Sequence, residues 1–108
     1  MSEEKMGTQY AREIAQLFRE TAGECKYPTV AEKLTGVAGE LETLAGKLYF
    51  KTQKGTEDMQ KIASDLANFR GALAACNEAG AAQSFCLPVF ARIEPILQHV
   101  KTMKVRMT

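Results

Sequence analysis

The stretch that decides the fold runs from Thr29 to Leu48 and reads TVAEKLTGVAGELETLAGKL. Its large apolar residues recur at alternating steps of four and three positions, at Val30, Leu34, Val37, Leu41, Leu44 and Leu48. This spacing puts one apolar stripe along one side of an α-helix and predicts a seam against another helix. Thr29 and Glu32 have the spacing of a capping box, which predicts that the helix begins near residue 30.

Similar stripes occur on both sides of this stretch, and no segment alternates with the period of two that is typical of strands. The pattern predicts four helices, at about residues 3–24, 30–53, 57–79 and 85–105. Short connections between helices favour antiparallel neighbours. We therefore expect an all-α fold, an antiparallel up-down-up-down four-helix bundle that forms a single domain over residues 1–108. Helices 2 and 3 should then pack side by side.

Two details of this bundle can be predicted from residue positions. Pro95 falls inside the fourth helix, where the missing amide hydrogen predicts a kink or a break. Alternating helix directions would also gather Cys25, Cys76 and Cys86 at one end of the molecule. The methionines and most of the basic residues near helix ends would gather at the other end.

Composition narrows the function classes. The chain has 108 residues, of which 45% are hydrophobic, and its formal net charge of +1 provides no overall field for nucleic acid or an anionic membrane. No apolar run has the roughly 20 residues needed to span a bilayer. The three cysteines lack any CxxC pair, which agrees with reduced thiols. We expect a cytoplasmic protein that does not bind membranes.

Most catalytic and cofactor motifs are missing from the sequence. There is no HExxH, no Glu-x-x-His, no GxxxxGK[ST], no GxGxxG and no GxSxG. The sequence therefore predicts no cofactor and no assembled catalytic set. The favoured function is a non-catalytic protein–protein interaction or regulatory module.

His99 is the single histidine, and Arg92 precedes it by seven residues on the same edge of the fourth helix. This R-x6-H spacing resembles the R-x4-6-H motif of HEPN-type ribonucleases, which are small helical domains. The resemblance implies that Arg92 would hold an RNA phosphate and that His99 would assist proton transfer without a metal. The alternative is a solvated pair whose stems cover apolar surface. Binding of nucleic acid is expected only under the ribonuclease hypothesis.

The cysteines provide a second alternative function. If Cys25, Cys76 and Cys86 gather at one end of the bundle, they could form a thiol or metal site. Reduced cysteine also packs as a small apolar residue in helical cores, so the same positions are compatible with a purely structural role.

The candidate binding residues lie at the opposite end and on the second helix. Basic and pliable side chains could form a docking surface for an acidic helix, and aromatic residues at the margin of a stripe could anchor an interface. These candidates are Lys101, Met103, Lys104, Arg106, Tyr49 and Phe50. The expected partner is another protein or a second copy of the chain, with a homodimer as the simplest form.

Overall fold

The computed structural model describes residues 7–79 and 83–107, and it contains helices and no strand in those ranges. The all-helical class predicted from the sequence is thus confirmed for the described residues. Ser2 and residues 3–6, where the first helix was expected to begin, lie outside them. The helices are α1 (Gly7–Glu24), α2 (Pro28–Leu44), the 3-10 helix η1 (Leu48–Lys51), α3 (Gln53–Ala79), α4 (Gln83–Ala91) and α5 (Ile93–Met107).

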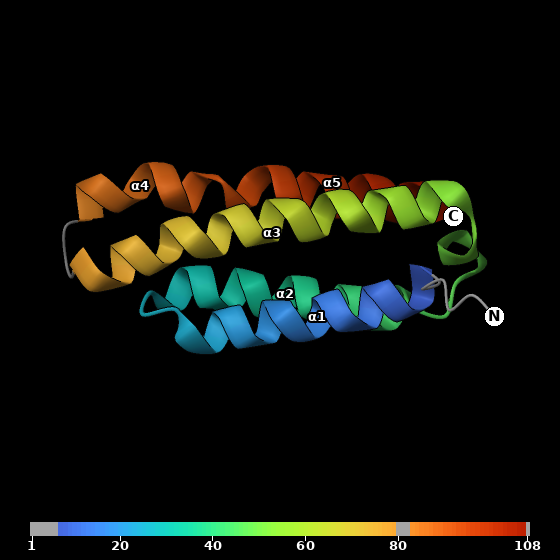
Figure 1. Cartoon of the computed structure of the whole chain (residues 1–108), viewed down its shortest axis with the longest axis horizontal. Helices are drawn as coiled ribbons and strands as arrows, with labels where there is room; N and C mark the ends of the chain where they lie inside the picture. Colours follow the sequence, from blue (N-terminus) through green and yellow to red (C-terminus); the bar gives the residue numbers. More distant parts are fainter. Residues whose placement is uncertain (1–6, 80–82, 108) are drawn as a thin grey trace.

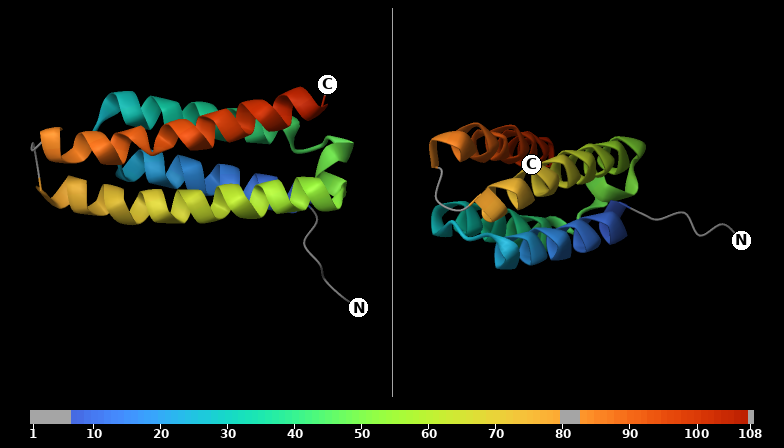
Figure 2. Two further views of the ribbon diagram at one scale, coloured as in Figure 1. Left: turned by 90° about the horizontal axis from the view of Figure 1, so that it is seen from above. Right: turned by 60° about the vertical axis from the view of Figure 1, so that its left-hand side comes forward.

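The helices form two stacked layers. Figure 1 shows α1 beside α2 in one layer and α3 beside α4 and α5 in the other, with successive long segments running in alternate directions. Across the layers, α1 contacts α3 and α2 contacts α5. Each of these pairs runs in the same direction, which the left view of Figure 2 also shows for α2 and α5.

The prediction that helices 2 and 3 are antiparallel neighbours is wrong. The pair α2 and α3 is not among the helix pairs in extensive contact, whereas α1 and α3 are. The reason lies in the connection, which contains η1 and is longer than the short turn expected from the sequence. Because η1 packs against both α1 and α3, the chain crosses the molecule diagonally before α3 begins.

The second helix begins and ends earlier than its apolar pattern predicts. Pro28 occupies the first helical position after Tyr27, where its missing amide hydrogen costs little. Thr29 is therefore inside the helix and does not cap it. At the other end, α2 stops at Leu44, so Leu48 belongs to η1.

This early end reverses the expected orientation of two residues. Leu48 was predicted to be buried in the seam, but it is 76% exposed. Phe50 was predicted to lie at the margin of the stripe, where it could anchor an interface, but it is fully buried and packs in the core. The physical reason is a change of phase, because the extended backbone at Lys47 rotates the residues that follow relative to α2.

Helix α3 starts at Gln53, earlier than the expected residue 57, because Thr52 caps it. The Gly55 amide donates to Thr52 Oγ1 at 3.0 Å, and that hydroxyl donates to the Tyr49 carbonyl at 2.7 Å. Gly55 is buried where η1 approaches the helix closely. A Cβ atom there would overlap the Tyr49 carbonyl and lie 2.9 Å from Phe50 Cα. Gly55 therefore permits this contact, whereas the sequence pattern placed it in a turn.

Pro95 does not produce the predicted kink. The last helical stretch is interrupted at Arg92, three residues before the proline, and it bends by only 9°. Pro95 cannot donate a hydrogen bond to the Ala91 carbonyl, one turn earlier. The Arg92 amide instead donates to the Val89 carbonyl at 3.0 Å, a tighter turn that separates α4 from α5 with little change of direction.

One apolar core fills the space between the layers. Most of the predicted stripe positions are buried, and Ala11, Ala15 and Phe18 widen the stripe of α1. The small Ala38 of α2 and Ala45, which follows the last residue of α2, are buried as well. No helix among the described residues combines the length and apolar character that crossing a bilayer requires.

Candidate functional site

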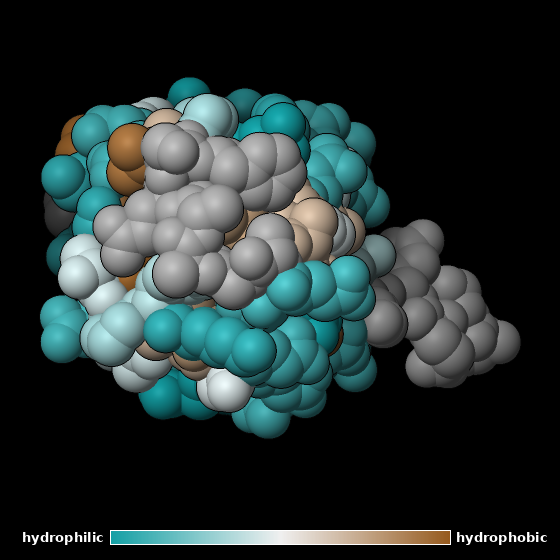
Figure 3. All heavy atoms as spheres, turned by 90° about the vertical axis from the view of Figure 1, so that its left-hand side faces the viewer, coloured by the Kyte–Doolittle hydropathy of each residue, from teal (hydrophilic) through white to brown (hydrophobic). Residues whose placement is uncertain are grey.

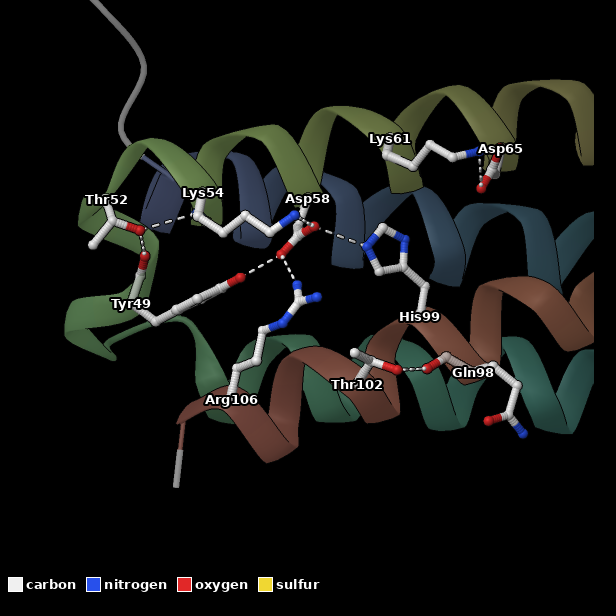
Figure 4. A network of polar contacts seen from close by, with 11 residues as sticks. Tyr49, Thr52, Lys54, Asp58, Lys61, Asp65, Gln98, His99, Thr102 and Arg106 are labelled. Atoms are coloured by element: carbon white, nitrogen blue, oxygen red, sulfur yellow. Dashed lines mark hydrogen bonds and ion pairs between the residues drawn. The ribbon is translucent and has the colours of Figure 1, made fainter.

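A buried carboxylate near the start of α3 is the centre of a polar network that joins three elements. Asp58 is 4% exposed. Its Oδ1 lies 3.0 Å from His99 Nε2 and 3.4 Å from Lys54 Nζ. Its Oδ2 accepts hydrogen bonds from the Tyr49 hydroxyl and from Arg106 Nη1, the latter at 3.2 Å. Figure 4 shows these four side chains converging on Asp58 from η1, α3 and α5.

The network favours the ionised form of the carboxylate. Burial by itself raises the pKa of Asp58, but hydrogen bonds from Tyr49 and His99 and the charge of Lys54 together bring it below the ordinary value of 3.8. Burial, followed by the hydrogen bond to Asp58, raises the pKa of Tyr49. At neutral pH, Asp58 is therefore a charged acceptor and Tyr49 is a neutral donor.

This arrangement is better suited to holding neighbouring helices together than to catalysing a reaction. An ionised carboxylate only accepts hydrogen bonds, so His99 Nε2 carries the hydrogen that it shares with Asp58. Each carboxylate oxygen already has two partners, and the donors come from η1, α3 and α5. The network thus fixes η1 and the C-terminal half of α5 to the start of α3.

We expect Asp58→Asn to lower the free energy of unfolding by about 2 kcal/mol at pH 7, the usual contribution of a hydrogen-bonded charge. The folded-state pKa of Asp58 is lowered, so its stabilising contribution is present at neutral pH and is lost as the pH falls through that pKa. The difference between wild type and variant should therefore shrink at acid pH. Urea titrations at pH 7 and pH 3 measure it.

Asp65→Asn is the matched control. Asp65 lies on the same helix, two turns further on, and its one ion pair among the described residues is an i,i+4 contact with Lys61 at 3.0 Å. Such a pair is worth about 0.3 to 0.5 kcal/mol, so this substitution should be nearly neutral at both pH values. A loss for Asp58→Asn that is the same at pH 7 and pH 3 would contradict an ionised Asp58 in the folded state.

The two residues of the ribonuclease hypothesis lie in different surroundings. His99 points towards Asp58, with 20% of its side chain exposed. Arg92 lines a shallow hollow of about 310 Å³ with Lys61, Asp65 and Asn68, and the lining of that hollow does not include His99. The structure therefore brings His99 together with a carboxylate, and it gives Arg92 a separate hollow.

The candidate binding residues are also separated. Arg106 and Tyr49 contact Asp58, and Lys104 pairs with Glu40 of α2 at 3.1 Å. Met103 and Phe50 are fully buried, so neither is available to a partner in this structure. Lys101 alone lines an open hollow between α2 and α5.

The three cysteines gather at the opposite end of the molecule, as predicted, and Tyr27 lies between them. The Tyr27 hydroxyl donates to the Cys76 carbonyl at 3.1 Å and lies 3.9 Å from Cys86 Sγ. Cys25 Sγ lies 3.5 Å from the Tyr27 carbonyl. The Tyr27 ring packs on Phe90, with 4.7 Å between ring centroids. Figure 3 views this end, where hydrophilic residues cover most of the surface that is not grey.

Cys76 and Cys86 are buried, and the Cys76 thiol has the properties of a core residue. Burial, followed by the contact with Cys86, raises the pKa of Cys76 to about 11. A thiol with this pKa stays protonated at neutral pH and is a poor nucleophile and metal ligand. Within residues 7–79 and 83–107, no group of three or more His, Cys, Asp or Glu side chains is placed to hold a metal ion.

An apolar groove runs along α2 where it faces α4 and α5. One hollow, of about 320 Å³, lies between the start of α2 and Phe90 and Ile93. A second, of about 280 Å³, lies between Gly36 and Val37 of α2 and Leu97 and Val100 of α5. Lys33 lines both hollows, so they lie next to each other along α2. We call these two hollows together the α2–α5 groove.

Ion pairs cross the α2–α5 groove at two levels. Lys33 pairs with Glu94 at 2.9 Å, and Glu40 pairs with Lys104 about two turns further along α2. Gly36 lies between the two pairs, and a Cβ atom there would meet nothing within 4 Å. The groove is therefore open at Gly36 because that residue has no side chain and its neighbours do not fill the space.

Comparisons with protein-family models, curated proteins and solved structures find no match to this chain. The site must therefore be interpreted from the side chains themselves.

The sequence did not predict a role for Asp58, which falls at the start of the predicted third helix. One signal was present, because Asp58 precedes Ile62 by one turn and so shares the buried stripe of α3. A carboxylate in a buried stripe requires partners.

Proposed function

We propose that this protein is a non-catalytic helical interaction or regulatory module that associates with a second copy of itself. One observation carries the proposal: the α2–α5 groove stays open and apolar, whereas His99 and the thiols make contacts inside the molecule. The proposal treats the helices as one up-down-up-down bundle. The alternating directions in Figure 1 and the single core support this description.

Exposed apolar side chains add support. Among the residues whose burial the structure describes, the exposed large apolar side chains are Leu48, Leu87 and Val105, at 76%, 61% and 72%. Val105 follows Lys101 by one turn of α5 and so extends the apolar rim of the groove beyond Leu97. Apolar surface on a small domain is typical of protein contact sites where it is contiguous, and the groove and Val105 lie on the same helix, α5.

We expect the protein to associate reversibly, with a sedimentation coefficient that rises from the monomer to the dimer value between about 1 μM and 1 mM, the range of weak to moderate affinities. Sedimentation velocity over this concentration range measures it. A second copy is the simplest partner because two-fold dimers are the commonest symmetric assemblies. A monomer at all concentrations would contradict the proposal.

The ribonuclease and metal alternatives are not proposed. Arg92 and His99 face different surroundings, which does not favour the ribonuclease alternative. The protonated state of the Cys76 thiol disfavours the metal alternative. The ribonuclease hypothesis and the cytoplasmic location stay predictions from the sequence.

A further inference from the structure

Two exposed charges of opposite sign near the α2–α5 groove have no ion-pair partner among the residues that the structure describes. Lys101 lines the hollow on the α5 side. Glu32 is exposed on α2, one turn before Gly36. Neither side chain makes an ion pair or a side-chain hydrogen bond with the residues that the structure describes. The other charges at the groove, Lys33, Glu94, Glu40 and Lys104, are already paired across it.

The two unpaired charges are offset along the groove. The two ion pairs fix the register of the parallel helices α2 and α5, and they place Lys101 at a level between Gly36 and Glu40. At 1.5 Å per residue, Glu32 then lies about 9 Å closer to the start of α2 than Lys101 does. The midpoint between the two charges falls close to Gly36.

We propose that a second copy of this chain docks face to face on the α2–α5 groove, with a two-fold axis near Gly36. A two-fold axis through the midpoint brings Glu32 of each copy opposite Lys101 of the other, so both unpaired charges gain a partner. Gly36 lies at the axis, where the absence of a side chain lets the two α2 backbones approach closely. This inference rests on the proposed self-association and names the surface that performs it.

The apolar floor of the groove would provide the attraction. Val37, Leu97 and Val100 line the central hollow, and Val105 extends the rim. Two copies would cover this surface from both sides, and burial of apolar surface is the main source of affinity in such contacts. The Glu32 and Lys101 pairs at the rim would then set the register of the two copies.

A charge-swap experiment tests the register. Glu32→Lys and Lys101→Glu should each weaken dimerisation by about tenfold or more, because every reversal creates two like-charge contacts in a symmetric dimer. The double variant Glu32→Lys/Lys101→Glu should restore the affinity, since the two pairs form again with their signs exchanged. Sedimentation velocity gives the dissociation constants, and circular dichroism checks that each variant keeps its helical content.

Substitutions at two glycines test whether the two α2 helices approach closely at the axis. Gly36→Gln should weaken the dimer by about tenfold or more, because a polar side chain would separate the two α2 helices. Gly71→Gln is the matched control, since Gly71 is an exposed helical glycine of α3 and a Cβ there also meets nothing within 4 Å. Thermal denaturation should show that neither substitution destabilises the fold, so a change in affinity alone would reflect the interface.

The results show separately whether the chain associates with itself and whether it does so through the α2–α5 groove. If the wild-type chain dimerises and neither the single reversals nor Gly36→Gln change the dissociation constant, the copies use another surface, and only this inference is overturned. If single reversals weaken the dimer and the double variant does not recover, the Glu32–Lys101 pairing is wrong. A wild-type chain that stays monomeric overturns both the inference and the proposed function.

Discussion

Phe50→Ala is expected to lower the free energy of unfolding by about 4 kcal/mol, within the usual range for a buried phenylalanine. Phe50 is fully buried, and η1 carries it into contact with α1 and α3. Its removal would leave a cavity where these elements meet, and the helices around it cannot close that space without losing other contacts. Urea denaturation followed by circular dichroism measures the loss.

Leu48→Ala is the control for this substitution, two residues away in the same short helix. Leu48 is 76% exposed, so its truncation should change the free energy of unfolding by less than about 0.5 kcal/mol. If α2 instead continued to residue 53 with unchanged phase, Leu48→Ala would be the costly substitution and Phe50→Ala the neutral one. The two variants therefore decide between the extended helix predicted from the sequence and the observed break.

The helical class could be predicted because each helix carries its own apolar pattern. Spacing of three and four residues identified the buried positions of α2, α3 and α5, among them Leu34, Leu41, Ile62, Leu66 and Val100. These positions depend on local periodicity, which a single sequence contains. The thiol cluster was predicted as well, because it depends only on alternating helix directions.

The wrong predictions concern the end of α2 and the placement of α2 relative to α3, which the local spacing of apolar residues does not determine. The steps of four and three continue from Leu44 to Leu48 in the sequence, but the chain leaves the helix at Leu44. Burial of Phe50 favours this break, and burial depends on α1 and α3, which are distant in sequence. The diagonal placement of α2 and α3 has the same origin, since it follows from how η1 packs.

The polar network around Asp58 also depends on contacts between residues that are distant in sequence. The sequence singled out His99 because it is the single histidine, and it grouped Arg106 with the other basic residues near the end of the chain. The partner of both is Asp58, 41 residues before His99. Only the fold brings these residues together, and it turns a suspected reactive histidine into one of four donors to a buried carboxylate. The α2–α5 groove likewise depends on tertiary packing that leaves Gly36 uncovered.

Gly55→Ala is expected to lower the free energy of unfolding by about 3 kcal/mol, at the upper end of the usual cost of overpacking. The added methyl group would overlap the Tyr49 carbonyl and crowd Phe50 Cα. Both obstacles are backbone atoms, so no change of a side-chain rotamer relieves the contact. The close approach of η1 to α3 would have to widen, and both the Thr52 cap and the Tyr49 hydrogen bond to Asp58 depend on it.

Gly71→Ala in the same helix should have the opposite effect on stability. A Cβ atom at Gly71 meets nothing within 4 Å, so alanine there gains helix propensity and should stabilise the protein by up to about 1 kcal/mol. Both residues are helical glycines of α3, so alanine gains the same helix propensity at each. A loss of unfolding free energy at Gly55 is then due to the contact with η1. Thermal and urea denaturation of both variants measure the contrast. Stabilisation of both variants would mean that η1 does not lie against the first turn of α3, and the Asp58 network would then lose the contact that holds Tyr49 in place.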